Sequence, residues 1–464
     1  MGEKRVLTEK EIRVKVISEL IRNFIFLAIA VLIAQPIFYV ILAKMFAGKM
    51  KYYRYNEQTT FLPKFTYYIH PIIKITAIVL LLLLVTYCVL MRSSTKQYRF
   101  KPVKALALNN LTIVFFMLTF AWITFAFCFS EDYLFSFWDV IDYKRGYVYF
   151  ICYAVIVMAI LCCTKKQKFT FLEVLIFVGF IINLLAEIKY CFGVNFRTYE
   201  VEDAAIFSNR NHYGYFLSII TILSAVRLYL TKNKYLEVYY ALNLIISEFA
   251  LLISQTRGSF VGVVISIVLM LVYFGIKRKF NWKLIIVPAI MIVTFLTLEI
   301  SGVTMFMDRL GLLASDIATT ANSSSHTEEE VEAAGSGRIA IWKQVIEQIK
   351  TSPIVGVGIG RTTMEHNEFL QIAAWSGIPA ALLYVCALFF MVIDLFKKKT
   401  KLTDTQLVAT FAVISYATQS FFGGAMLQTV PFYIIVLALS LNIKVDKKTE
   451  IEEVSTNSGN QQKQ

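Results

Sequence analysis

Long apolar runs dominate this sequence and constrain its fold more than any other feature. Hydrophobic residues make up 57% of the 464 positions, above the share found in soluble domains. About twelve runs approach or exceed the roughly 20 residues that a helix needs to cross a bilayer. They lie at 22–46, 69–91, 106–128, 147–163, 169–189, 212–230, 235–254, 258–276, 282–300, 367–394, 405–422 and 426–443. The sequence therefore predicts an all-α polytopic membrane protein with about twelve transmembrane helices.

The net charge of +14 does not indicate binding to nucleic acid, because the basic residues are distributed along the whole chain. Lys and Arg gather before the first apolar run and then in every second loop. This is the positive-inside pattern of membrane proteins, and contact with anionic lipid headgroups accounts for the positive balance. We predict both termini in the cytoplasm and the largest loop, 301–366, on the extracytoplasmic side.

The apolar runs and loops divide the chain into four parts. These are predicted spans one to nine in 1–300, the extracytoplasmic loop in 301–366, spans ten to twelve in 367–444, and a polar cytoplasmic tail in 445–464. We expect the tail to be disordered.

The large loop itself has two parts. Residues 314–337 are rich in Ser, Ala, Thr and Glu, which is typical of a mobile segment. Residues 338–350 place four apolar side chains on one helical face, and these are Ile339, Trp342, Ile346 and Ile349. This spacing predicts an amphipathic helix, capped by Ser336, whose apolar stripe lies on the membrane or against the bundle.

A polar island at 335–377 stands out from the apolar background. It contains Arg338 at a predicted helix start, a turn with three glycines (GVGIG), and then His366-Asn367. The turn is not a nucleotide-binding loop, since no strand precedes it and no GK[ST] follows it; it predicts close backbone packing instead. Polar groups kept together at one membrane face indicate chemistry at that place.

Two arginines of this chain are candidates for holding an anion. Arg257, in SQTRGSF, lies in a tight turn between two apolar runs, where it either snorkels to headgroups or clamps an anion with its forked guanidinium. Arg338 opens a helix, where the helix dipole disfavours a cation unless an anion binds there as well. The competing interpretation of Arg338 is an ordinary surface arginine.

His366 is the candidate general base. A helix N-terminus disfavours its protonated form and so keeps an imidazole able to accept a proton near neutral pH. Asn367 would contact a sugar hydroxyl or orient the ring. The alternative is a histidine that only marks the membrane interface.

A second polar segment, IFSNRNHYGYF at 206–216, precedes the sixth predicted span. Its Arg210 and Asn211 suit contacts with a carbohydrate or a diphosphate, and helix capping by asparagine is the competing account. The sequence contains no metal-ligand pattern such as HxxH or DxD, so we expect neither a metal nor a cofactor.

Three of these segments resemble the motifs of the O-antigen ligase and polymerase superfamily, which are bacterial membrane enzymes that ligate or polymerise lipid-linked glycans. The matching segments are SNRNHYG, SQTRGS, and GSGRIAIWKQVIEQIKTSPIVGVGIG followed by HNEFLQIAAWSGIPAALLY. Together they cover roughly residues 206–390, and the last of them is the most specific. The Ser/Glu-rich insert before Gly335 departs from the family pattern.

The resemblance implies a fold like that of the C-type glycosyltransferases (GT-C) and a site at the outer face of the cytoplasmic (inner) membrane. It also implies an undecaprenyl-diphosphate-linked oligosaccharide donor, a glycan acceptor, and no metal or cofactor. Arg257 and Arg338, with Arg210, would hold the diphosphate, and His366 would activate the acceptor hydroxyl. Cations that stabilise the departing charge and one base are sufficient for such a transfer. A flippase and chain-length regulator proteins are further expected partners, besides the lipid bilayer.

We therefore expect a polymerase of lipid-linked oligosaccharide units in the biosynthesis of a surface polysaccharide such as O-antigen, capsule or exopolysaccharide. An O-antigen ligase, which transfers the glycan to a lipid or protein acceptor, shares these motifs and remains an alternative. A lipid-linked oligosaccharide flippase or another transporter is the alternative from a different class. The number of spans suits a transporter, whereas a large outer loop with an arginine, a helix and a histidine suits it less.

Overall fold

The computed structural model describes residues 9–45, 65–93, 110–138, 146–193, 205–207, 209–308, 337–362, 365–397, 402–424 and 428–441, and isolated positions between 311 and 327. Within these ranges all the regular secondary structure is helical, which confirms the all-α prediction. The predicted tail at 445–464, Ser336 and most of the predicted mobile segment at 314–337 lie outside the described residues.

The described helices occur in the following order along the chain. They are α1 (Glu9–Met45), α2 (Phe65–Ser93), α4 (Leu111–Phe127), α5 (Tyr133–Trp138), α6 (Tyr147–Cys162), α7 (Lys165–Phe192), α8 (Arg210–Leu230), α9 (Lys234–Ile253), α10 (Arg257–Ile276), α11 (Lys283–Ile300), α14 (Arg338–Thr351), α15 (Glu368–Ser376), α16 (Ile378–Phe396), α17 (Asp404–Gln419), the 3₁₀ helix η3 (Ser420–Phe422) and α18 (Val430–Ser440).

Eight of the described helices are long and apolar enough to cross a membrane, namely α1, α2, α7, α8, α9, α10, α11 and α16. Three more, α4, α6 and α18, are apolar but shorter. The protein is therefore a multi-pass helical membrane protein, while the predicted number of about twelve spans is not reached by these criteria. Each predicted run nevertheless contains at least one helix, since run length and apolarity are local properties of the chain.

The tenth predicted span, 367–394, is wrong as one continuous helix. The chain breaks at Gly377, which has a left-handed φ of 88°, and α15 and α16 form on either side of it. A Cβ on Gly377 would lie 1.9 Å from the carbonyl oxygen of Ile354, so the backbone approaches here as only glycine allows. The amide of Ile378 donates to the carbonyl of Pro353 over 2.8 Å, and this bond holds the break in place.

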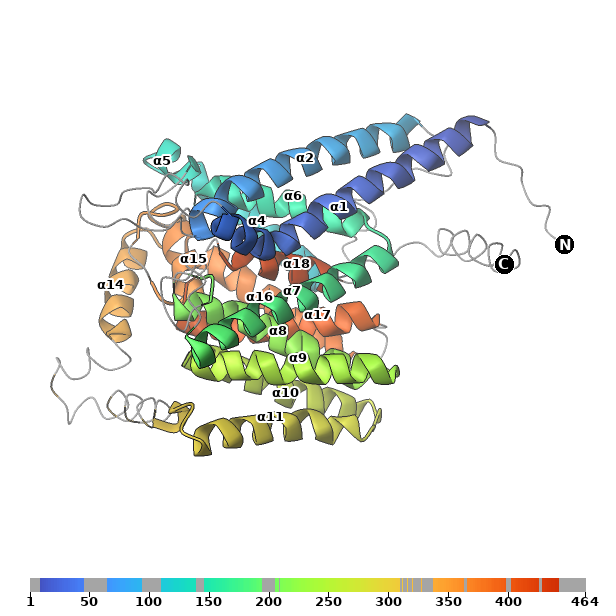
Figure 1. The fold of residues 1–464 in the computed structure, drawn as a ribbon. Helices are drawn as coiled ribbons and strands as arrows, with labels where there is room; N and C mark the ends of the chain where they lie inside the picture. The colour runs from blue at the N-terminus through green and yellow to red at the C-terminus, as the bar shows by residue number, and fades with distance from the viewer. Residues whose placement is uncertain are drawn as a thin grey trace.

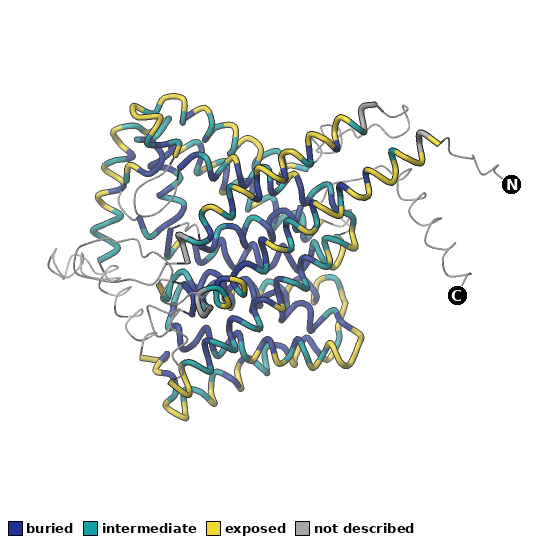
Figure 2. The backbone as a smooth tube through the Cα atoms, turned by 45° about the horizontal axis from the view of Figure 1, so that its top comes forward, coloured by how far each residue is buried: buried dark blue, intermediate teal, exposed yellow. Residues whose placement is uncertain are grey.

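The helices pack side by side around α8, which is buried along nearly its whole length (Figure 1). Its closest partners are α9, α17 and α10. Figure 2 shows buried backbone through the centre of the bundle and more exposed backbone where α1 and α2 extend beyond it. A second, smaller core joins α4, α6, α14 and α15, and it includes Val345, Ile349 and Trp375.

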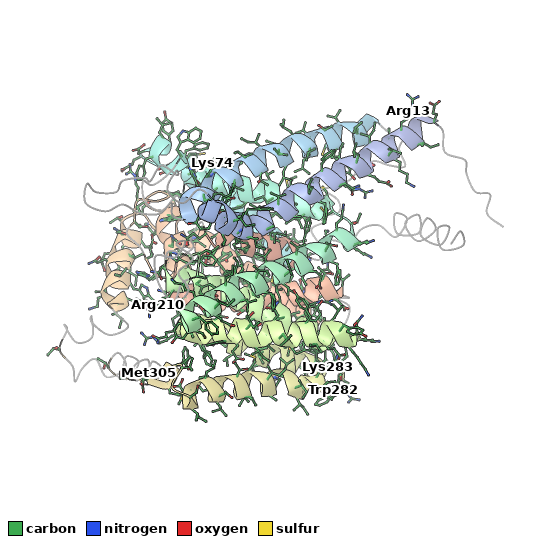
Figure 3. All side chains as sticks on the ribbon, viewed as in Figure 1. Arg13, Lys74, Arg210, Trp282, Lys283 and Met305 are labelled. Atoms are coloured by element: carbon green, nitrogen blue, oxygen red, sulfur yellow. The ribbon has the colours of Figure 1, made fainter. Side chains whose placement is uncertain are left out.

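The bundle has two ends, which carry different helices. Figure 1 shows α14 and α15 at one end and the start of α1 at the other. Figure 3 places Arg210 at the end that carries α14 and Lys283 at the opposite end. We call the first of these the α14 end. At the opposite end the buried cations are paired, with Arg227 Nε 2.8 Å from Glu173 Oε1 and Lys283 beside Glu237.

The amphipathic helix predicted at 338–350 is confirmed as α14, but its buried stripe differs from the prediction. Val345 and Ile349 are buried, whereas Ile346 is exposed. The stripe therefore faces the protein, in the smaller core, because α15 packs against α14. The N-cap position is Gly337, with a left-handed φ of 76°, and the predicted cap, Ser336, lies outside the described residues.

Candidate functional site

Three helices at the α14 end begin with an arginine. Arg210, Arg257 and Arg338 are the first residues of α8, α10 and α14. All three are half-buried, and each also makes an interaction within the chain. A helix N-terminus carries partial positive charge, so a cation there is disfavoured by about 0.3–1 kcal/mol and an anion is favoured. Three such helix starts bring arginine side chains and backbone amides to the same end of the bundle.

The starts of α8 and α10 lie directly against each other. A Cβ on Gly214 of α8 would lie 2.2 Å from Ser259 Oγ and 2.5 Å from Thr256 Oγ1. Only a glycine allows this approach, and it brings the first turns of the two helices together. Arg210 and Arg257 therefore belong to neighbouring helix starts.

The short helix η3 connects these starts to α15. Ser420 donates to the carboxylate of Glu368 over 2.6 Å, and the rings of Phe421 and Phe369 stack at 4.3 Å. On the other side, Phe422 lies beside Gly258 of α10, where an added Cβ would be 2.7 Å from the Phe422 Cβ. α15 and the residues that precede it are thus fixed against the same end of the bundle as α10.

His366 lies just before α15, at the position preceding the N-cap. Asn367 is the N-cap, and its Oδ1 accepts from the amides of Phe369 and Leu370 over 3.0 and 3.1 Å. His366 is half-buried, and its backbone is left-handed with φ of 50°. The structure therefore places His366 at a helix start, as predicted, although this helix is the short α15 and not a spanning helix.

An asparagine also caps α8, in the polar segment that precedes this helix. Asn209 is the N-cap of α8, and its side chain accepts from the amide of Asn211 over 2.7 Å. Asn211 is half-buried in the first turn, beside Arg210. The alternative account, helix capping, is thus correct for Asn209. The Oδ1 of Asn367 likewise caps α15. The side chain of Asn211 caps no described helix.

Two buried carboxylates flank His366-Asn367, and the sequence analysis missed both. Glu365 is fully buried and Glu368 nearly so. The available signal was the pattern Glu-His-Asn-Glu directly before an apolar stretch, because ionisable groups in such a place are costly unless they have a structural or chemical role.

Glu368 belongs to a buried polar cluster at the start of α15. Its Oε1 lies 3.5 Å from the hydroxyl of Tyr384, which is 2.7 Å from the hydroxyl of Tyr433. Burial raises the pKa of Glu368 from its usual 4.5 to about 7, and the hydrogen bonds from Ser420 and Tyr384 offset only part of this rise. The carboxyl therefore titrates near neutral pH.

Tyr215 connects this cluster to Arg338. The buried Tyr215 hydroxyl interacts electrostatically with both Glu368 and Arg338. Since electrostatic effects of this kind weaken with distance, Arg338 of α14 lies in the neighbourhood of α8 and α15. The arginine of α14, the start of α15 and the first turns of α8 therefore meet at one end of the protein.

The glycine-rich turn packs against α15, as the sequence predicted. A Cβ on Gly356 would lie 2.4 Å from the backbone carbon of Trp375, and Gly356 has a left-handed φ of 73°. The amide of Val357 donates to the carbonyl of Ala374 over 2.8 Å. The turn thus fixes the chain between α14 and His366 against the end of α15. Within the described residues no group of three or more His, Cys, Asp or Glu side chains is arranged to hold a metal ion.

Fold and site together define a multi-pass helical membrane protein in which three helices that begin with an arginine, and a histidine, lie at one end. Residues 242–385 match the family model described as O-antigen ligase. The match includes Arg257, Arg338 and His366, and it identifies this segment as a domain of the O-antigen ligase and polymerase superfamily, which confirms the resemblance seen in the sequence. No curated protein matches the chain significantly.

Proposed function

We propose that this protein polymerises oligosaccharide units linked to undecaprenyl diphosphate, in the biosynthesis of a surface polysaccharide. The observation that carries the proposal is that His366 lies at the same end of a membrane bundle as helices that begin with an arginine. These residues belong to a segment that matches the O-antigen ligase family. A GT-C-like fold and a location of this end at the outer face of the cytoplasmic membrane belong to the same proposal. The alternating positive loops of the sequence support that orientation.

In the proposed reaction the donor diphosphate is held by Arg257 and Arg338, with Arg210 as a further contact. Guanidinium groups pair with phosphate oxygens through two parallel hydrogen bonds, and the helix N-termini add backbone amides to the same task. These groups stabilise the negative charge that grows on the diphosphate as it leaves. They supply the charge stabilisation for which a divalent metal is used in other sites.

His366 acts as the general base on the acceptor. A hydroxyl of the acceptor glycan attacks the anomeric carbon of the donor, and the bond from that carbon to the diphosphate oxygen breaks. The hydroxyl proton passes to the His366 imidazole, and undecaprenyl diphosphate departs with the bonding electron pair. Asn367 and Asn211 are proposed as sugar contacts beside these groups.

An O-antigen ligase is the second candidate, because the matching family model is described by that activity. The chemistry at the donor is the same, and the acceptor differs. We favour the polymerase, since no second acceptor-recognition motif is evident in the sequence.

The test is reconstitution of the full-length protein in liposomes with lipid-linked oligosaccharide extracted from source cells that lack this chain. A polymerase uses a second lipid-linked unit as the acceptor, so it makes a ladder of products that remain on the acceptor's undecaprenyl diphosphate, in the presence of EDTA as well as in its absence. Products that appear only after an acceptor lipid or protein is added would favour the ligase. Movement of the donor across the bilayer without any new glycosidic bond would favour the flippase and contradict the proposal.

A further inference from the structure

His366 lies between two residues that are each anchored to the protein. Its own φ of 50° is in the left-handed region, which residues with a Cβ adopt infrequently. On one side Asn367 is fixed by its cap on α15. On the other side the anchor is Glu365, whose side chain and backbone are both held by hydrogen bonds.

The carboxylate of Glu365 is fully buried and bonded to two side chains. Its Oε1 accepts from the indole N–H of Trp375 over 3.1 Å and from the hydroxyl of Thr362. The same indole also donates to Thr362 Oγ1 over 2.7 Å, so the three side chains close a triangle. A buried carboxylate needs such donors, and this triangle fixes the chain before His366 onto α15.

The backbone of Glu365 is tied to α14. Its carbonyl oxygen accepts from the indole N–H of Trp342 over 3.0 Å. Trp342 follows Arg338 by four residues, so the two lie on the same face of α14. The next residues of that face, Val345 and Ile349, pack into the smaller core. Glu365 therefore links the helix of Arg338 directly to the loop of His366.

We propose that Glu365 is the positioning residue of this site. Its carboxylate holds the left-handed backbone of His366 against α15, and its carbonyl holds the same loop against α14. Together the two contacts set where the imidazole stands relative to Arg338. The inference rests on the proposed function, in which His366 is the base and Arg338 binds the donor.

The first experiment measures kcat and KM for the extracted lipid-linked oligosaccharide with the reconstituted full-length protein. Glu365→Ala removes the carboxylate, and we expect kcat to fall about 10–100-fold, since a displacement of about 1 Å at a reacting group has an effect of that size. KM should stay within about two-fold, because the arginines remain. Glu365→Gln keeps an acceptor oxygen for the indole and should recover most of the rate. Glu347→Ala, which changes an exposed glutamate of α14, is the matched control and should leave kcat unchanged.

The second experiment separates positioning from a general loss of structure. If Glu365 acts through His366, Glu365→Ala should lower kcat no further in a His366→Ala background. If the two losses multiply, the positioning role is overturned. Should Glu365→Ala fail to fold, Trp375→Phe and Trp342→Phe remove one indole donor each while keeping an aromatic ring, and the same non-additivity is expected of them.

The outcomes also distinguish this inference from the proposed function. An active His366→Ala protein would overturn both, because no base would then need positioning. An inactive His366→Ala protein together with a folded Glu365→Ala protein of full kcat would overturn the positioning role alone. A loss of kcat that appears only when His366 is present supports both.

Discussion

The hydroxyl of Ser420 donates a hydrogen bond to Glu368 Oε2 over 2.6 Å. This bond joins η3 to the first residue of α15, two positions after His366, and it lies in a fully buried environment. The start of α15 is thereby held through a carboxyl whose ordinary state at neutral pH would be charged. Burying a charged carboxyl is costly, so the stability of the protein should depend on pH.

The raised pKa of Glu368, about 7 against a usual 4.5, makes stability fall as pH rises. Between these values the folded protein keeps the proton that the unfolded chain releases, so the contribution is full below about pH 4.5 and is lost through pH 7. Thermal unfolding in detergent at pH 5 and pH 8 should show a larger loss for the wild type than for Glu368→Gln. Glu347→Gln, at an exposed carboxyl, should lose as much stability between pH 5 and pH 8 as the wild type. An equal loss in Glu368→Gln and the wild type would refute the prediction.

Arg257→Lys and Arg338→Lys should each lower polymer formation at least about ten-fold while the protein still inserts at normal levels. Lysine keeps the charge but loses the forked geometry that fits phosphate oxygens. The measurement is the polymer ladder from cells, normalised to the membrane content of the protein. Arg278→Lys, in an exposed turn at the opposite end of the bundle, should have no effect. Wild-type ladders in both variants would favour the snorkelling interpretation.

His366→Ala should lower kcat by about 10²–10⁴-fold, the usual contribution of a general base, while binding of the donor is retained. The pH–rate profile should lose its acidic limb in this variant, because the group that must be deprotonated is gone. His326→Ala provides the comparison, because His326 belongs to the Ser- and Glu-rich segment 314–337 and has no role in the proposed reaction, and its rate should be close to that of the wild type. An active His366→Gln protein with an unchanged profile would assign the base to another group.

Gly377→Ala should destabilise the protein by at least about 2 kcal/mol, the combined scale of a strained left-handed residue and an overpacked contact. The new Cβ would lie 1.9 Å from the Ile354 carbonyl oxygen at a φ of 88°. Gly275→Ala is the matched control, since no atom lies within 4 Å of its added Cβ, and a helix gains about 0.5–1 kcal/mol from this change. Equal unfolding midpoints of the two variants would show that the break at Gly377 tolerates a side chain.

The two ends of the bundle should lie on opposite sides of the membrane. In a cysteine-free background, Gln344→Cys on α14 should react with an impermeant maleimide in intact cells, whereas Lys279→Cys, between α10 and α11, should react only after permeabilisation. Both positions are exposed in the structure. The reverse result would invert the orientation and place the arginine-headed end in the cytoplasm.

The sequence alone was sufficient for the helical architecture and for the family of the matched segment. Apolar run length is a local property, so each predicted run contains a helix, and the motif around Arg257, Arg338 and His366 needed no contacts to be recognised. The break at Gly377 was missed, although Pro379 in the first turn of α16 is a local signal of a helix start. Only the tertiary structure shows the close approach of Ile354 to Gly377, a contact between two segments.

Tertiary structure also decided which groups of the island are buried. In α14 the isoleucines fit two overlapping stripes, and packing against α15 selected the stripe of Val345 and Ile349 and left Ile346 exposed. Glu365 appeared in the sequence as one charged residue among several. Its position became evident only where Trp342, Trp375 and Thr362 converge on it, since hydrogen-bond partners from different segments are fixed by the fold and by no local pattern.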